Sequence, residues 1–219
     1  MTLDLSEVQQ FYDRFGKKQD LQGFYEDPAL DELIGHARFD EAKSVFEFGC
    51  GTGRFAARLL SDHLPASATY CGCDLSRTMV DLARERLASY GDRAQVLQSE
   101  GGIRFPLSDH SVDRIVSTYV LDLLSESDIE AFLHEAYRVI EAGGTMCVVS
   151  LTRGTTFASR IVSGIWAAIF RMRASLVGGC RPIRLEPYID EGAWEVAYQK
   201  VVIAYGVPSD VLIVRARES

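Results

Sequence analysis

The chain has 219 residues, of which 47% are hydrophobic, and this is enough to bury the core of a single domain. Its 23 basic and 31 acidic side chains give a formal net charge of -8, which argues against a protein that binds nucleic acid mainly by neutralising phosphates. The five cysteines show no CxxC pair, so we expect reduced packing cysteines and no metal site.

The N-terminal segment, residues 1–42, starts without the basic and apolar regions of a secretory signal, which favours a cytoplasmic protein. Aromatic side chains occur among charges between residues 11 and 25; they are Phe11, Tyr12, Phe15, Phe24 and Tyr25. This pattern is typical of an amphipathic helical segment that covers the edge of a sheet.

Strand and helix patterns alternate through residues 43–151. Short apolar or β-branched runs predict strands at 45–48, 69–73, 94–97, 112–118 and 145–151. Helical periodicity lies between them at 54–62, 77–89 and 127–140. Ser76 is placed to cap the second helix, and Ser127 with Glu130 predicts a capping box at the start of the third. The alternation predicts an α/β fold with a mostly parallel sheet that helices cover on both faces.

The pattern changes after residue 151. An arginine-rich segment, residues 152–190, separates the alternating core from the C-terminal residues 191–219. Within the latter, runs at 194–205 and 210–217 predict two strands joined by the sequence GVPS. This hairpin would add an antiparallel pair to the edge of the sheet.

A glycine-rich turn follows the first predicted strand. Gly49, Gly51 and Gly53 have G-x-G-x-G spacing and follow Glu47, whereas a dinucleotide fingerprint needs G-x-G-x-x-G to seat a pyrophosphate. A carboxylate at the strand end favours a ligand with cationic groups, and S-adenosylmethionine has a sulfonium and an ammonium but no phosphate. The turn could also be only a tight connection between strand and helix.

Asp74 ends the second predicted strand about twenty residues past the glycines, where an acidic side chain can accept both ribose hydroxyls of an adenosine. Leu75 and Met79 would then supply apolar contacts to the adenine. The other interpretation makes Asp74 a carboxylate at a helix N-terminus and Met79 a core residue. Together, the glycine-rich turn and Asp74 point to a ligand that carries adenosine without phosphate.

Four stretches occur in order through this region: EFGCGTGRFA, GCDLSRTMVDLARERL, FPLSDHSVDRIVSTYVLDLL and AYRVIEAGGTMCVVS. They resemble the successive motifs of class I S-adenosylmethionine-dependent methyltransferases, particularly the type 11 and ubiquinone/menaquinone-biosynthesis groups. The resemblance covers residues 43–151 and implies a Rossmann-like, seven-stranded sheet in the order 3-2-1-4-5-7-6 with strand 7 antiparallel. It also implies that residues 1–42 form a lid over the cofactor and the acceptor.

The same resemblance implies which residues bind the cofactor. Glu47 and the glycine-rich turn hold the methionine moiety, and Asp74 holds the ribose. The family usually has Gly-Asp-Ala after the third strand, where this chain has QSEGGIRF, so Glu100 replaces the Asp that binds the adenine amino group and Gly101 offers its backbone. The full predicted set is Glu47, Gly49, Cys50, Gly51, Gly53, Asp74, Leu75, Met79, Glu100 and Gly101.

Methyl transfer from a sulfonium depends mainly on alignment, so a general base is optional. Tyr119, just beyond the fourth predicted strand, is the candidate to line the transfer site, although an ordinary packing role is equally compatible with its position. Tyr12 in the predicted lid is a candidate substrate contact. The four histidines are interpreted as structural or solvated; they are His36, His63, His110 and His134.

Residues 142–185 contain no Asp, Glu or Lys, and their six arginines are Arg153, Arg160, Arg171, Arg173, Arg181 and Arg184. Such uncompensated charge in an acidic chain indicates an anionic partner. Between Arg160 and Arg171 the apolar residues form a wide arc on a helical wheel. This pattern fits a substrate lid, a helix in the interface of an anionic membrane, or a buried helix with solvated arginines. Arg181 and Arg184 are candidate substrate contacts.

We therefore expect an S-adenosylmethionine-dependent methyltransferase that releases S-adenosylhomocysteine and methylates a small anionic or lipophilic metabolite. One alternative is an enzyme that works at the membrane surface on a phospholipid or a quinone precursor. An alternative of another class is a non-catalytic regulatory or partner protein that binds S-adenosylmethionine. Peripheral contact with an anionic membrane is compatible with these readings, and a nucleic-acid partner is not expected.

Overall fold

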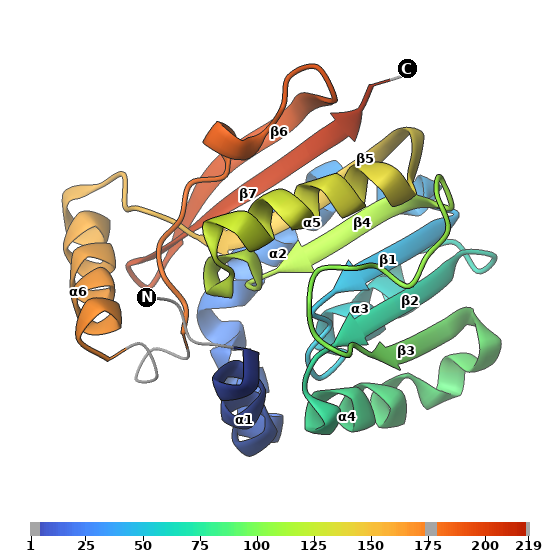
Figure 1. Ribbon diagram of the computed structural model, residues 1–219, viewed down its shortest axis with the longest axis horizontal. Helices are drawn as coiled ribbons and strands as arrows, with labels where there is room; N and C mark the ends of the chain where they lie inside the picture. The colour runs from blue at the N-terminus through green and yellow to red at the C-terminus, as the bar shows by residue number, and fades with distance from the viewer. Residues whose placement is uncertain (1–4, 174–178, 218–219) are drawn as a thin grey trace.

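The computed structural model describes residues 5–173 and 179–217, and Figure 1 shows their arrangement. Seven strands form one sheet in the order β3-β2-β1-β4-β5-β7-β6. Neighbouring strands from β3 to β5 are parallel, whereas β7 runs antiparallel to both β5 and β6. In chain order the strands are β1 (Ser44–Phe48), β2 (Thr69–Asp74), β3 (Ala94–Gln98), β4 (Val112–Thr118), β5 (Ile140–Leu151), β6 (Trp194–Ala204) and β7 (Val207–Ala216). This order confirms the class I fold predicted from the sequence.

Helices cover both faces of the sheet. In chain order the α-helices are α1 (Leu5–Phe15), α2 (Gly23–Ala37), α3 (Arg54–Arg58), α4 (Arg77–Leu87), α5 (Glu126–Val139) and α6 (Phe157–Arg173). Helices α2, α3 and α4 contribute to the hydrophobic cluster on one face, and α5 contributes to the cluster on the other. Between α1 and α2 lies a 3-10 segment, Gly16–Gln22, and a π-helical turn, Leu59–His63, continues α3.

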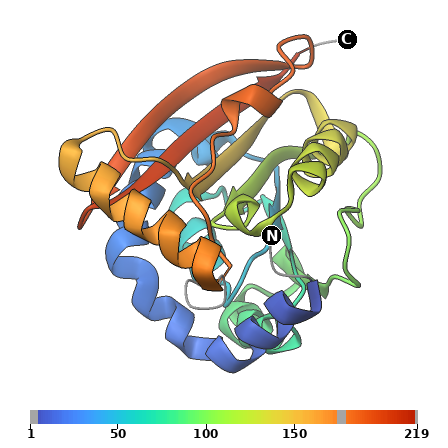
Figure 2. The same ribbon diagram turned by 60° about the vertical axis from the view of Figure 1, so that its left-hand side comes forward.

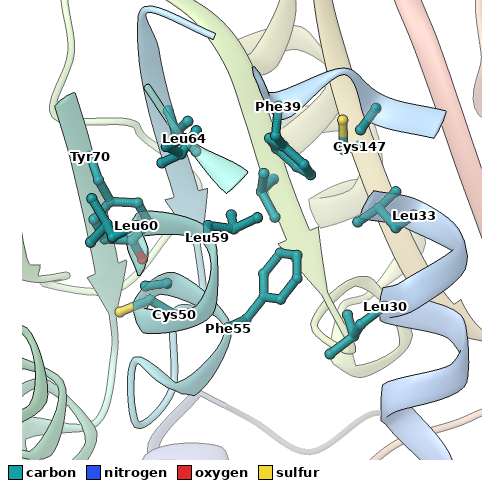
Figure 3. Packing of buried hydrophobic residues seen from close by; sticks show 14 of the residues in the cluster. Leu30, Leu33, Phe39, Cys50, Phe55, Leu59, Leu60, Leu64, Tyr70 and Cys147 are labelled. Atoms are coloured by element: carbon teal, nitrogen blue, oxygen red, sulfur yellow. The ribbon is translucent and has the colours of Figure 1, made fainter. Parts of the chain in front are cut away.

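The alternation of side chains along a strand explains why both faces are apolar. On β1, Val45 belongs to one buried cluster and its neighbour Phe46 to the other, because successive side chains of a strand point to opposite faces. Figure 3 shows the first cluster, where Leu30 and Leu33 of α2 lie near Phe55 of α3. Parallel strands buried on both faces require such continuous apolar runs.

Two helix starts test the predicted caps. Ser76 accepts a hydrogen bond from the Met79 backbone amide at 3.2 Å, which confirms the predicted cap of α4. The cap of α5 is Ser125, which accepts from the Asp128 amide at 3.2 Å, so the prediction of Ser127 as the cap was wrong. Ser125 has the extended backbone that a capping residue needs, and the helix already begins at Glu126.

The C-terminal hairpin is present, but its turn is not GVPS. Strand β6 ends at Ala204 and β7 begins at Val207, so the turn consists of Tyr205 and Gly206. Both residues have positive φ, 52° and 83°, as a two-residue type I′ turn requires to match the twist of the strands. The residues after Gly206 therefore pair in the sheet rather than turn.

Helix α6 stands at the edge of the molecule, apart from the other helices, in Figure 1, and Figure 2 shows it lying across the front of the molecule. It lies within the arginine-rich segment and packs beside the β6–β7 hairpin, where Val162 approaches Gly206. The side chains of Arg171 and Arg173 lie outside the described residues. Within the described residues, no helix is long and apolar enough to span a bilayer.

Candidate functional site

A cavity of about 440 Å³ opens at the carboxyl ends of the parallel strands. Open α/β sheets bind ligands at this edge, where the connections after β1 and β4 diverge to opposite faces. Helix α1 closes one side of the cavity with Val8, Gln9 and Tyr12. The rest of the lining comes from the ends of β1, β2 and β4, the turns after β1 to β4, and α5: Phe48, Gly49, Gly51, Cys73, Asp74, Leu75, Ser76, Ser99, Gly101, Gly102, Ile103, Thr118, Tyr119, Val120, Leu123, Leu124, Ser125 and Asp128, with Gln19 from the 3-10 segment.

The glycine-rich turn wraps around the end of β1. The amides of Gly49 and Cys50 both donate to the carbonyl of Cys73, at 2.8 and 3.0 Å, and fold the turn back against β2. Gly49 has a φ of 77°, and a Cβ at this position would lie 2.3 Å from the nearest methyl group of Val120. Only glycine fits here, because the turn needs both a left-handed backbone and close contact with the segment after β4.

Asp74 ends β2 and holds two turns together with one carboxylate. Its Oδ2 accepts from the Gly51 amide and its Oδ1 from the Ser76 amide, both at 2.9 Å. Burial raises the pKa of Asp74 to about 6, and these backbone donors oppose that rise. Each carboxylate oxygen has a further lone pair, so the group can still accept hydrogen bonds from a ligand in the cavity.

Glu47 lies on the other side of the glycine-rich turn, one residue before the end of β1. It is buried, and its Oε2 accepts a 2.6 Å hydrogen bond from the Tyr70 hydroxyl. Burial raises its pKa to about 7. Glu47 lines a separate cavity of about 40 Å³, together with Asp20, Glu26 and Cys50, and not the larger one. Acidic side chains therefore approach the glycine-rich turn from both sides.

Tyr119 borders both cavities and is held in an unusual conformation. Its φ of 57° places a bulky residue in the left-handed region, and its amide donates to the Val149 carbonyl at 2.7 Å. The hydroxyl forms a 2.9 Å hydrogen bond with Ser209 Oγ, and the ring meets Tyr25 edge-on at 6.0 Å. Burial raises the pKa of the hydroxyl, so it stays protonated at neutral pH. Backbone strain of this kind clusters at functional sites.

The N-terminal segment is tied to the ligand-binding turns by its own carboxylates. Asp13 accepts from Ser76 Oγ at 2.5 Å, and Asp20 accepts from Thr52 Oγ1 at 2.6 Å and from Arg86 at 2.5 Å. These bonds hold α1 and the 3-10 segment against the turns after β1 and β2. The segment lines one side of the cavity without being part of the sheet, and its role as a lid stays a prediction.

Several predicted site residues are not brought to the cavity. Met79 is completely buried and does not line it, as expected for a core residue. Glu100 is exposed, although its neighbours Ser99 and Gly101 do line the cavity. Gly53 packs against Ala83 of α4, where a Cβ would stand only 3.1 Å away.

The two predicted substrate arginines also lie elsewhere. Arg181 donates through Nη1 to the carbonyls of Leu124 and Asp122, at 2.5 and 3.3 Å, so its charge stabilises the connection after β4. Arg184 is exposed and pairs with Glu186 at 3.5 Å. Neither side chain lines the cavity, whereas Tyr12 does. Leu123 and Leu124 also line the cavity, although they were not among the predicted site residues. Their position shortly after a buried strand was the one signal in the sequence that could have identified them.

The charges of the larger cavity discriminate between adenosine-containing ligands. Among its described lining residues the charged side chains are Asp74 and Asp128, and none is basic. A pyrophosphate would meet no compensating charge there, whereas a cationic ligand without phosphate would be favoured. Gln19 Oε1 is buried beside Gly51 without a partner among the described residues, and it offers an acceptor to a ligand amine. The site thus fits S-adenosylmethionine.

Comparison with known proteins supports the same assignment. A family described as "Methyltransferase domain" matches residues 45–144. The tRNA N(3)-methylcytidine methyltransferase Mettl2 of Drosophila melanogaster is 26% identical over 126 residues, which are 56% of this chain and 39% of that protein. The demethylmenaquinone methyltransferase of Porphyromonas gingivalis is 27% identical over 115 residues, 52% of this chain and 46% of that protein. The chain thus spans less than half the length of these two relatives.

The fold has solved counterparts as well. A complex of the Trm112 methyltransferase activator of Haloferax volcanii with a methyltransferase contains a chain that aligns with a TM-score of 0.76 and 15% identity. The alignment covers 97% of this chain and 98% of that one. The family match covers the glycine-rich turn and β1 to β4, and it ends within β5. The chain therefore contains a methyltransferase domain, matched at residues 45–144, and has the class I S-adenosylmethionine-dependent methyltransferase fold.

Proposed function

We propose that this protein transfers the methyl group of S-adenosylmethionine to a small lipophilic acceptor. The observation that carries the proposal is the composition of the 440 Å³ cavity, which joins the cofactor-binding turns to a largely apolar wall. The wall includes Phe48, Ile103, Val120, Leu123 and Leu124. Because none of the described lining residues is basic, an anionic acceptor is disfavoured, and the lipophilic half of the sequence-based expectation is retained.

In this proposal the chain binds the cofactor through residues already in place. Asp74 would accept the ribose hydroxyls, the turn at Gly49 and Gly51 would lie against the methionine moiety, and Leu75 and Gly101 would border the adenine. When bound, S-adenosylmethionine supplies a methyl group that its sulfonium has already activated. What remains for the protein is to exclude water and to align the acceptor, which accounts for up to about 7 to 11 kcal/mol in well-oriented reactions.

Tyr12 and Tyr119 would enclose the acceptor from the lid and from the sheet. Since the Tyr119 hydroxyl is hydrogen-bonded to Ser209 and stays protonated at neutral pH, it suits a positioning or donor role better than that of a general base. Tyr12 lies at the cavity wall near Cys180, and burial raises the pKa of its hydroxyl too. An acceptor that needs no strong base therefore fits this site best.

The relatives name acceptors of different classes, a tRNA cytidine and a demethylmenaquinone. The second is the better guide here, because the acidic chain and the acidic cavity both oppose binding to tRNA phosphates. We infer that the protein meets its acceptor at the surface of a membrane, as a peripheral protein. A lipophilic acceptor would partition into that surface.

Two measurements test the proposal. In calorimetry, S-adenosylhomocysteine should bind and raise the melting temperature, whereas NAD should do neither. After incubation with methyl-labelled S-adenosylmethionine and cell extract, the label should appear in the organic-solvent fraction. Tighter binding of NAD would refute the cofactor assignment, and label confined to nucleic acid or to water-soluble anions would refute the acceptor class. Cofactor binding without any transfer would favour the non-catalytic alternative.

A further inference from the structure

The outward face of α6 is apolar. Phe157, Ile161, Ile165 and Met172 are 83%, 47%, 57% and 86% exposed. Their spacing of four, four and seven residues places them in a single stripe along the helix. Large apolar side chains that gather on one exposed face mark an interaction site, unlike single ones scattered over a surface.

The opposite, inward face carries two buried serines beside Val162 and Trp166, which pack on the body of the protein. Ser159 is completely buried and Ser163 nearly so. Ser163 Oγ accepts from the Gly154 amide at 3.0 Å, and Trp166 Nε1 donates to the Cys180 carbonyl at 3.0 Å. These bonds fix the rotation of α6 about its axis, so the apolar stripe is held outward by specific contacts.

Positive charge borders the stripe. Arg160 lies one position before Ile161, and Arg153 lies in the connection that leads to the helix; both are exposed. Neither forms an ion pair with a carboxylate of the described residues. The surrounding sequence, residues 142–185, has six arginines and no acidic residue in a chain whose net charge is -8. This local charge is complementary to an anionic surface.

From these observations we propose that α6 docks the protein onto an anionic bilayer, with its axis in the membrane plane. The apolar stripe would enter the boundary between headgroups and acyl chains, while Arg160 and Arg153 would lie among the anionic headgroups. A second copy of this chain is a poorer occupant, because a symmetric contact through α6 would bring the same arginines together. Docking does not depend on methyl transfer.

The docking face is connected to the cavity through a short series of contacts. Trp166 of α6 binds the backbone at Cys180, and the Cys180 thiol lies within hydrogen-bonding distance of Tyr12, which lines the cavity. Beside α6, the turn residue Tyr205 is 81% exposed and stacks edge-on against Phe24 at 5.4 Å. A bilayer touching α6 would therefore lie close to the cavity wall formed by α1.

Flotation with lipid vesicles tests the proposal on the full chain without cofactor. Vesicles of equal parts phosphatidylglycerol and phosphatidylcholine should capture the protein, vesicles of phosphatidylcholine alone should capture it poorly, and about 1 M salt should release it because screening then acts within about 3 Å. Ile165→Glu and Arg160→Glu should each lower capture about tenfold.

Matched variants elsewhere control for charge and exposure. Val196 on β6 is 52% exposed, and Arg77 on α4 is also exposed, so Val196→Glu and Arg77→Glu should float like the unaltered protein. Unchanged melting temperature and S-adenosylhomocysteine binding would show that all variants are folded. Absence of capture, or capture that Ile165→Glu does not reduce, would overturn the proposal. A dimer that Ile165→Glu dissociates, without vesicle capture, would overturn it in favour of a second copy.

Discussion

The amide of Gly51 donates a 2.9 Å hydrogen bond to Asp74 Oδ2, so the carboxylate that ends β2 also holds the glycine-rich turn that follows β1. The second oxygen of the same carboxylate holds the start of α4 through the Ser76 amide. One side chain thus shapes both turns that would receive the cofactor. Loss of Asp74 should affect the turns as well as the contacts to the ligand.

Asp74→Ala should weaken S-adenosylhomocysteine binding at least tenfold. Hydrogen bonds to a charged group contribute about 1.5 to 3 kcal/mol each, and about 1.4 kcal/mol corresponds to a tenfold change in affinity. Asp74→Asn keeps one acceptor oxygen for a backbone amide, so its affinity for S-adenosylhomocysteine should lie between that of the unaltered protein and that of Asp74→Ala. Calorimetry measures both variants. A folded Asp74→Ala protein with unchanged affinity would mean that the ribose is bound elsewhere.

Glu47 should make the cofactor-free protein less stable as pH rises. Its pKa rises from 4.5 in the unfolded chain to about 7 in the fold, so the folded state binds more protons between these values. The free energy of unfolding therefore decreases as pH rises through this range, by on the order of 3 kcal/mol for this group. Glu26 and Asp122, whose pKa values burial also raises to about 7, act in the same direction.

Glu47→Gln isolates that contribution, because an amide oxygen can still accept from the Tyr70 hydroxyl while the charge is removed. Chemical denaturation at pH 5 and pH 8 should show a smaller loss of stability for this variant than for the unaltered protein. Glu85→Gln on the exposed surface of α4 serves as the control and should follow the unaltered protein. If the free energy of unfolding decreased equally between pH 5 and pH 8 for Glu47→Gln and for the unaltered protein, the pH dependence would not come from Glu47.

Substitutions of Arg181 and Arg184 should have different effects on the stability of the protein, and neither should raise the acceptor KM strongly. Arg181→Gln removes charged donors from the carbonyls of Leu124 and Asp122 and should cost about 1 to 3 kcal/mol of unfolding free energy. Arg184→Gln removes only an exposed pair with Glu186 and should change stability by less than about 1 kcal/mol. Denaturant titration separates the two. A strongly raised acceptor KM for Arg184→Gln would place that side chain at the substrate after all.

Gly49→Ala should disable the cofactor site, and Gly143→Ala provides its control. Both glycines have positive φ, 77° and 73°, so both substitutions carry a backbone cost of about 1 to 2 kcal/mol. Only at Gly49 does the new Cβ also meet a neighbour, Val120 at 2.3 Å, which adds about 1 to 3 kcal/mol of overpacking. The melting temperature and the affinity for S-adenosylhomocysteine should both decrease much more for Gly49→Ala than for the control variant. Equal losses would show that strain alone governs the turn.

The positions of strands and helices in the core could be predicted because they depend on local patterns. Apolar runs bounded by turn residues located β1 to β5, and β4 matches its predicted range, residues 112–118. Parallel strands joined by helices bring their carboxyl ends to one edge of the sheet, so Asp74 and the glycine-rich turn were expected to meet. The hydrogen bond between Gly51 and Asp74 has that origin.

The surroundings of individual side chains could not be predicted, because they depend on contacts between residues that are far apart in the sequence. Met79 faces the core and Arg181 reaches carbonyls 57 and 59 residues away, contacts that no local pattern reveals. The turn at Tyr205 requires positive φ in a residue with no strong preference for it, and β-sheet pairing imposes that conformation. The amino-acid sequence determined that α6 has a wide apolar arc, whereas the tertiary hydrogen bonds of Ser163 and Trp166 decided which part of that arc faces outward.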